Sequence, residues 1–169
     1  SKTNPTSPNG VARLNAEKSW VELAASKDLQ VQIFRLAGIY SNQSNILTRL
    51  KSGEAKIINK KNHFFSRIHV EDIANILFKS LENFKAKEIY NISDDKPASA
   101  EEVISYGSKL INIEKPKTVE LSSIESEIIK NFYKDSKKVS NKKMKNFFSY
   151  ELKHSSYIEG LRYIRDNFI

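Results

Sequence analysis

The chain has no cysteine among its 169 residues, so neither a disulfide framework nor a thiolate zinc site can form. Its three histidines, His63, His69 and His154, lack the spacing of a local metal-binding motif, and we expect no metal site. No apolar run approaches the roughly 18 to 20 residues that cross a bilayer, and residues 1–5 do not form an apolar signal core. We therefore expect a cytoplasmic protein with no membrane partner.

Glycine is also scarce. The five glycines stand at positions 10, 38, 53, 107 and 160, so neither GxGxxG nor GxxGxxG occurs in the chain. A glycine-rich turn of that kind lets the backbone approach a pyrophosphate at the amino end of a helix. We therefore expect that the isolated chain does not bind a dinucleotide tightly.

The residues that are present indicate a folded domain. Hydrophobic residues make up 39% of the chain and recur throughout it, which excludes a disordered tail. The net charge is +8, but the lysines are spread along the chain, so a solvated basic surface is the simpler interpretation. The densest basic stretch, residues 130–145, leaves nucleic-acid binding as an alternative that rests on charge alone.

Hydrophobic periodicity and end signals predict alternating helices and strands. The predicted elements are a helix from Ser7-Pro8 to about Ser26, a strand over 29–36 ended by Gly38, a helix over 45–52 closed by Gly53, a strand over 55–58, a helix over 70–81, a strand over 88–92, a helix from Ser99, an edge strand over 119–121 and a last helix over 158–168. The Ser-x-x-Glu spacing of a capping box precedes helices at Ser99, Ser122 and Ser156.

The helix over 70–81 joins two predicted strands, which is the βαβ pattern, so we expect a parallel pair with this helix on one face. Two parallel strands alone would leave two open sheet edges. We therefore expect more sheet before residue 1, which would make residues 1–169 a single incomplete domain and a fragment of a longer protein. Trp20 is expected in the core, and Asp94 with Asp95 in a turn without a functional role.

Four segments carry a joint signal: residues 5–17, 35–40, 66–74 and 90–97. In this order, and with an ending around 140–145 and 157–161, they resemble the extended short-chain dehydrogenase/reductases, also called NAD(P)-dependent epimerase/dehydratases. The resemblance implies an α/β fold: the carboxy-terminal part of a Rossmann-like parallel sheet over 1–95 and a small, mostly helical substrate lobe over 96–169. It also implies an oxidoreductase that uses NAD or NADP on a nucleotide sugar or a similar small molecule.

The family's catalytic pair is Tyr-x-x-x-Lys, and the matching positions hold Asn9 and Arg13. Asn9 has no proton to give near neutral pH, so acid–base chemistry is in doubt there. Arg13 offers a planar fork for ribose or phosphate, which makes it a candidate cofactor-binding residue. The substitutions leave a second reading open, a non-catalytic cofactor-sensing or scaffold protein of the same fold. In a third reading, both residues simply lie in an exposed first helical turn.

The resemblance places Gly38 and Tyr40 beside the nicotinamide, as candidate cofactor-binding residues, although a simple turn and a core residue would explain them equally well. It places Arg67 and His69 along the substrate cleft, as candidate substrate-binding residues, and His69 has a purely structural alternative. A homodimer is left open, because residues 11–26 match a region through which some family members dimerise.

Overall fold

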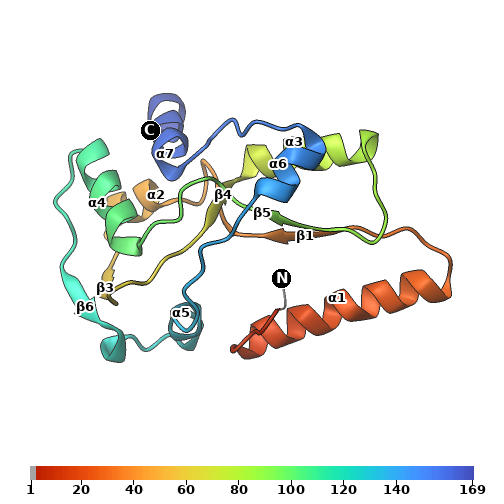
Figure 1. Ribbon diagram of the computed structural model, residues 1–169. Helices are drawn as coiled ribbons and strands as arrows, with labels where there is room; N and C mark the ends of the chain where they lie inside the picture. Colours follow the sequence, from red (N-terminus) through yellow and green to blue (C-terminus); the bar gives the residue numbers. More distant parts are fainter. Residues whose placement is uncertain (1–2) are drawn as a thin grey trace.

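The computed structural model describes residues 3–169. Figure 1 shows helices packed around short parallel strands. In chain order the elements are α1 (Pro8–Ser26), β1 (Ile33–Leu36), β2 (Gly38–Tyr40), α2 (Ile46–Lys51), β3 (Ile57–Asn59), β4 (Arg67–His69), α3 (Val70–Glu82), β5 (Ile89–Ile92), α4 (Ala100–Leu110), β6 (Thr118–Glu120), a 3-10 turn (Leu121–Ser123), α5 (Glu127–Phe132), α6 (Lys142–Phe148) and α7 (Tyr157–Phe168). Within residues 3–169, no helix is both long and apolar enough to span a membrane.

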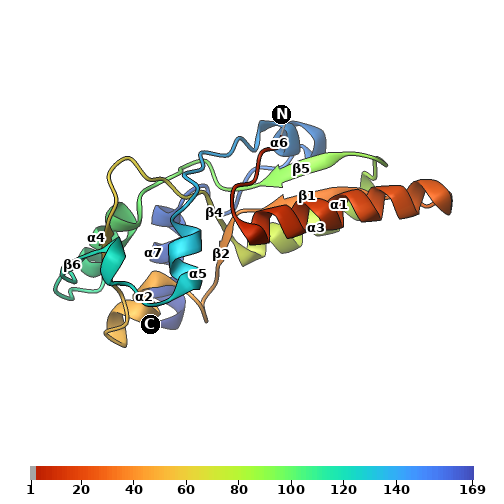
Figure 2. The ribbon, with the colours of Figure 1, turned by 90° about the horizontal axis from the view of Figure 1, so that it is seen from below.

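The predicted parallel pair is confirmed. Strand β1 pairs with β5 in parallel register, and α3 is the crossover helix between β4 and β5. Helix α1 lies on one side of this pair, and α3 and α6 lie on the other (Figures 1 and 2). The α/β class predicted from the alternation of elements is therefore correct.

The predicted role of Gly38 as the end of the strand is wrong. The strand ends at Leu36, and Gly38 begins the next one, because the chain changes its hydrogen-bonding partner at this point. The amide of Ala37 still donates to Ile92 O of β5 (2.9 Å), whereas the amide of Gly38 donates to Ser66 O (3.1 Å), just before β4. Strand β2 is thus a continuation of β1 with a new neighbour.

Helix ends follow the predicted signals in most places. Ser7 Oγ accepts from Gly10 N (3.2 Å) at the start of α1, and Ser99 forms the complete capping box with Glu102. Ser156 also caps its helix. The prediction for Ser122 is wrong: it lies in the 3-10 turn, and the cap of α5 is Ser126.

Two apolar clusters form most of the core. The first lies between the strands and helices α3 and α6, and it is built from Ile68, Ile73, Ile76, Tyr90, Ile92, Met144, Phe148 and Tyr150. The second holds α2, α4 and α7 together and is built from Tyr40, Leu47, Ala98, Val103, Tyr157, Leu161 and Ile164. Trp20 belongs to neither: it is 61% exposed, so its predicted core position is wrong. Only Ala24 of α1 is buried, because the apolar residues of this helix do not gather on one face.

Candidate functional site

The strands β1 and β5 separate at their carboxyl ends, and β4 lies between their continuations. On one side β4 pairs with β2, in the register Gly38↔Arg67 and Tyr40↔His69. On the other side the amide of Asp94, which follows β5, donates to Arg67 O (2.6 Å). We call this region, made of Gly38–Tyr40, Arg67–His69 and residues 93–94, the strand junction. Ligands of open α/β sheets bind at such a place, outside the carboxyl ends of strands that diverge.

Arg67 is held at the strand junction by backbone carbonyls. Its Nη1 donates to Phe65 O (3.1 Å) and Ala98 O (3.0 Å), and its side chain is largely enclosed. Burial lowers the pKa of Arg67, and the nearby Asp94 opposes that effect. The guanidinium remains a cation, and within residues 3–169 its Nε and Nη2 groups have no hydrogen-bond partner, so they can hold an anion.

Asp94 is the functional candidate that the sequence analysis missed. Its loop position was predicted correctly, but the residue is only 1% exposed. Its Oδ1 accepts from Lys96 N (3.2 Å), whereas Oδ2 has no hydrogen-bond partner among residues 3–169. Burial raises the pKa of Asp94 to about 7, with Arg67 acting in the opposite direction. A buried carboxyl with such a pKa beside an arginine is typical of functional sites. The one available signal was its place directly after a buried parallel strand.

A hollow of about 340 Å³ opens next to the strand junction. Its lining residues are almost all polar or charged: Asp94, Asp95, Val139, Ser140, Asn141, Lys142, Lys145 and Asn146. Asn141 Nδ2 donates to Ser93 O and to Asp95 Oδ1, both at 2.8 Å, and Lys145 Nζ lies 2.9 Å from Asp95 Oδ2. These bonds fix the wall of the hollow. Lys142 adds a positive charge to the same lining.

Gly38 and Tyr40 lie at the strand junction, but both have contacts within the chain that explain them. A Cβ at Gly38 would lie 3.3 Å from Ser66 O, so a glycine suits the close strand pairing. Tyr40 is 8% exposed, and its hydroxyl donates to Ser156 O (3.4 Å). The ring lies so close to Gly160 that a Cβ there would be 2.0 Å from the Tyr40 hydroxyl. Tyr40 is therefore a packing residue of the second apolar cluster.

Asn9 and Arg13 belong to α1 and not to the strands of the junction. Both are exposed in the first turns of α1, as the third reading of the sequence expected. Among residues 3–169, no hydrogen bond or ion pair links either of them to Gly38, Arg67 or Asp94. The pairing of β2 with β4 thus brings the two predicted substrate-binding residues together with the two predicted cofactor-binding residues of β2. The role of Asn9 and Arg13 stays a prediction.

His69 ends β4 and caps α3, since its Nδ1 accepts from Glu71 N (3.3 Å). Burial lowers the pKa of His69 to about 4, and the neighbouring His154 adds to that effect. The structural alternative for His69 therefore has direct support. The sequence spacing of His69 and His154 predicts no local motif, yet their two ring centroids are only 4.0 Å apart.

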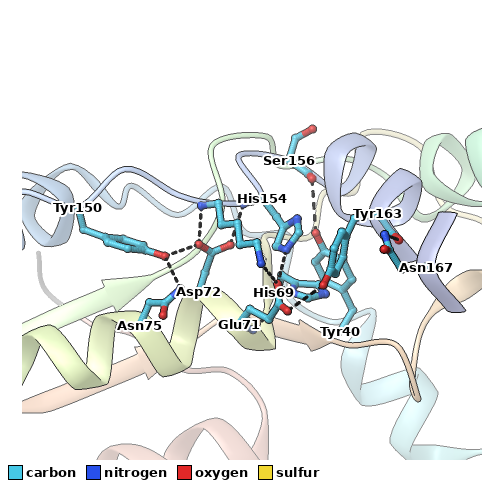
Figure 3. Close-up of polar contacts among 11 residues, drawn as sticks. Tyr40, His69, Glu71, Asp72, Asn75, Tyr150, His154, Ser156, Tyr163 and Asn167 are labelled. Carbon is cyan, nitrogen blue, oxygen red and sulfur yellow. Dashed lines mark hydrogen bonds and ion pairs between the residues drawn. The ribbon is translucent and has the colours of Figure 1, made fainter. Parts of the chain in front are cut away.

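Glu71 and Asp72, in the first turn of α3, link this helix to the segment before α7 and to α7 itself (Figure 3). Asp72 is fully buried and accepts from Tyr150 OH (2.7 Å), Lys153 N (2.7 Å) and His154 N (3.0 Å). Glu71 lies 2.8 Å from His154 Nε2 and accepts from Tyr163 OH (3.2 Å). The bond with His154 is the main reason why the pKa of Glu71 falls to about 2. As acidic residues in the first turn of α3, both carboxylates also interact favourably with the helix dipole.

No family profile and no curated protein matches this sequence. Solved structures do match. A conserved protein of unknown function from Silicibacter pomeroyi is 32% identical, with a TM-score of 0.91, over 99% of this chain and 58% of that one. The dTDP-glucose 4,6-dehydratase of Bacillus anthracis, in complex with NAD, is 18% identical, with a TM-score of 0.78, over 97% of this chain and 53% of that one. The UDP-glucose 4-epimerase of Thermotoga maritima, with UDP-glucose, is 18% identical, with a TM-score of 0.77, over 99% of this chain and 58% of that one.

These likenesses establish the fold. The dehydratase and the epimerase share too few residues with this chain to carry their activities over to it, and the more similar protein has no known function. The chain spans between 53% and 58% of the length of these three structures. The parallel strands and helices described above therefore correspond to part of the Rossmann-like fold of these structures, which confirms the predicted fold class.

Proposed function

Since the structure of this chain matches that of the extended short-chain dehydrogenase/reductases, the NAD(P)-dependent epimerase/dehydratases, we propose that it forms the substrate side of a site for a nucleotide sugar. The observation that carries the proposal is Arg67 at the strand junction, next to the buried Asp94. Nε and Nη2 of Arg67 donate to no group among residues 3–169. A nucleotide sugar offers a pyrophosphate, and a guanidinium binds phosphate oxygens in pairs.

In this proposal Arg67 recognises the anion, and Asp94 is a positioning residue. The carbonyls of Phe65 and Ala98 fix one end of the guanidinium, so its remaining N–H groups point in a defined direction. Asp94 supports the cationic form of Arg67 electrostatically. Lys142 in the wall of the adjacent hollow adds positive charge on the same side, whereas the charge of Lys145 is paired with Asp95.

The cofactor is a further proposal, NAD or NADP, because similar structures were solved with NAD and with NADPH. When bound, such a cofactor supplies hydride transfer. The residues present here do not make a dinucleotide site by themselves: the glycine-rich turn is missing from the sequence, Gly38 packs against Ser66, and Tyr40 is buried. We therefore assign no hydride step to this chain, and we propose that residues outside these 169 hold the pyrophosphate of the cofactor.

Asn9 favours the second candidate function, a non-catalytic protein of the same fold that senses a cofactor or serves as a scaffold. An amide at the position of the family's tyrosine cannot exchange a proton near neutral pH. If the protein together with the remainder of its fold reduces or epimerises a nucleotide sugar at an ordinary rate, this second candidate is excluded.

Calorimetry with the chain tests the main proposal. UDP-glucose and dTDP-glucose are titrated into the wild type, Arg67→Lys and the control Arg165→Lys, whose arginine is exposed and pairs with Asp166. We expect binding to the wild type and the control, and at least a tenfold loss for Arg67→Lys, because lysine keeps the charge but loses the fork. Equal affinity of all three proteins, or no binding of either sugar nucleotide to the wild type, contradicts the proposal. NAD and NADP are expected not to bind at micromolar concentration.

A further inference from the structure

Three side chains that can ligate a metal meet at the amino end of α3 (Figure 3). His69 and Glu71 come from the end of β4 and the first turn of α3, and His154 comes from the loop before α7. One donor atom from each residue lies within 4.8 Å of the other two. Nε2 of His154 is 2.8 Å from Oε2 of Glu71, and Nδ1 of His69 is 3.8 Å from the same oxygen.

These distances suit a small transition-metal ion. In a tetrahedral zinc site with bonds of about 2.0–2.1 Å, neighbouring ligand atoms are roughly 3.3 Å apart. The two measured separations, 2.8 Å and 3.8 Å, lie on either side of that value. The donor atoms therefore already lie near the separations that a tetrahedral site requires.

The surroundings also fit a metal site. Both imidazole side chains are only 3% exposed, while that of Glu71 is 34% exposed, so an ion can enter from the solvent past the carboxylate. Nδ1 of His69 accepts from Glu71 N, so an ion bound by this atom replaces the cap of α3, whereas Nε2 of His69 is buried without a hydrogen-bond partner among residues 3–169. Tyr163 holds the second oxygen of Glu71, and Asp72 holds the backbone of His154. Such second contacts orient the ligands of a metal.

One cation already competes for this place. Nζ of Lys153 lies 3.0 Å from Oε2 of Glu71, the same oxygen that the two imidazoles approach. An ammonium group and a divalent ion cannot share this oxygen, because their charges repel. The side chain of Lys153 is 51% exposed, so it can swing into the solvent when a metal ion arrives.

We propose that His69, Glu71 and His154 form a site for a divalent transition-metal ion of the Zn²⁺ class. Two imidazole nitrogens and one carboxylate oxygen bind the ion, water fills a fourth position, and Lys153 is the competing cation. The ion fixes the loop before α7 to the start of α3. This inference does not rest on the proposed binding of a nucleotide sugar.

Titration with Zn²⁺ and Co²⁺ tests the site. Calorimetry with ZnCl₂ and the visible absorption of bound Co²⁺ give affinity and ligand type, and MgCl₂ is the ion control, since Mg²⁺ prefers oxygen ligands. We expect one Zn²⁺ per chain, and a rise in Tm of about 5 °C or more at a hundredfold excess over Kd. Mg²⁺ is expected to have no such effect.

Matched variants assign the ligands. His154→Gln and Glu71→Gln should each weaken Zn²⁺ binding on the order of a hundredfold, and Glu71→Gln keeps a side chain able to bond to Tyr163, which guards against misfolding. His63→Gln changes the third histidine, which lies against Tyr133, and should leave the affinity unchanged. Lys153→Ala should tighten binding several-fold. The proposal is overturned if the wild type binds Zn²⁺ no better than Glu71→Gln, if His63→Gln loses as much as His154→Gln, or if Lys153→Ala weakens binding.

Discussion

Helices α1 and α3 flank the same pair of strands, but they are attached to the protein in very different ways. The longer helix, α1, has 19 residues and buries only Ala24, whereas α3 has 13 residues and buries Asp72, Ile73, Ile76 and Ser80. Both begin with a side-chain cap, and both were predicted from the sequence. A clear start signal and a long helical pattern therefore do not reveal how much of a helix is covered.

The difference arises from the spacing of apolar residues and from the partners at the helix start. In α3, Ile73 and Ile76 meet the cluster around Tyr90 and Phe148. The other large apolar residues of the predicted stripe, Val70, Leu77, Phe78 and Leu81, are exposed. Its first turn binds the segment that leads into α7. Helix α1 is attached to the strands mainly through the ion pair of Glu17 with Arg35, at 2.6 Å, beside a shallow groove.

The largest expected effect tests the packing of α3. Ile76→Ala should lower the free energy of unfolding by about 2–5 kcal/mol, because Ile76 is 1% exposed and its removal leaves a cavity. Leu77→Ala, one position further, should cost less than about 1 kcal/mol, since Leu77 is 43% exposed. Urea denaturation measures both. Equal losses of unfolding free energy in the two variants would contradict the conclusion that α3 is held by its buried face.

The second prediction concerns the buried part of the strand junction. The pKa of Asp94 in the folded chain is about 7, above the ordinary aspartate value, through burial and the charges of Asp95 and Asp72, while Arg67 acts the other way. The folded state thus favours the protonated carboxyl, and this contribution is complete below about pH 4 and is lost as the pH rises to about 7. We expect a loss on the order of 3 kcal/mol over that range, measured by urea denaturation at several pH values.

Asp94→Asn is the control for this prediction. Asparagine has the shape of aspartate but does not titrate, so its stability should change less between pH 4 and pH 7 than that of the wild type. A wild type and a variant with parallel pH profiles would show that Asp94 is hydrated, and the contrast between the enclosed junction and the exposed α1 would then be smaller than the structure indicates.

The third prediction addresses the start of α3. Asp72→Asn should cost about 1–3 kcal/mol, because an amide NH₂ group replaces one of the oxygens that accept from Tyr150, Lys153 and His154. Asp166→Asn changes an aspartate that is 55% exposed and should change stability by less than about 0.5 kcal/mol. Thermal denaturation of both variants provides the measurement, and a neutral Asp72→Asn would mean that this anchor contributes little.

The smallest effect is expected on α1. Trp20→Ala should change the free energy of unfolding by less than about 0.5 kcal/mol, because Trp20 is 61% exposed. Since Trp20 is the one tryptophan of the chain, its fluorescence should also be quenched readily by iodide in the wild type. A protected tryptophan, or a change in sedimentation on Trp20→Ala, would show instead that a second copy covers α1, as the homodimer left open by the sequence would require.

Much of the fold could be predicted because its signals are local. The caps at Ser7 and Ser99 involve residues three positions away, and the helical spacing over 70–81 repeats within a few turns. The βαβ rule then fixes the parallel pairing of β1 with β5. The family resemblance identified Arg67 and Gly38 as candidate site residues, and the structure places them opposite each other in register.

The sequence by itself thus determined most of the helices, the parallel pair and the lack of a glycine-rich turn, but it did not reveal β2, β4 or α6. Only the tertiary structure decided that Asp94 is buried, that Trp20 is exposed, and that His69 meets His154. The bond between His154 and Glu71 joins residues 83 positions apart, and no local pattern encodes such a contact. Its formation depends on how α7 packs against the strands, because the burial of a side chain is set by every element that surrounds it.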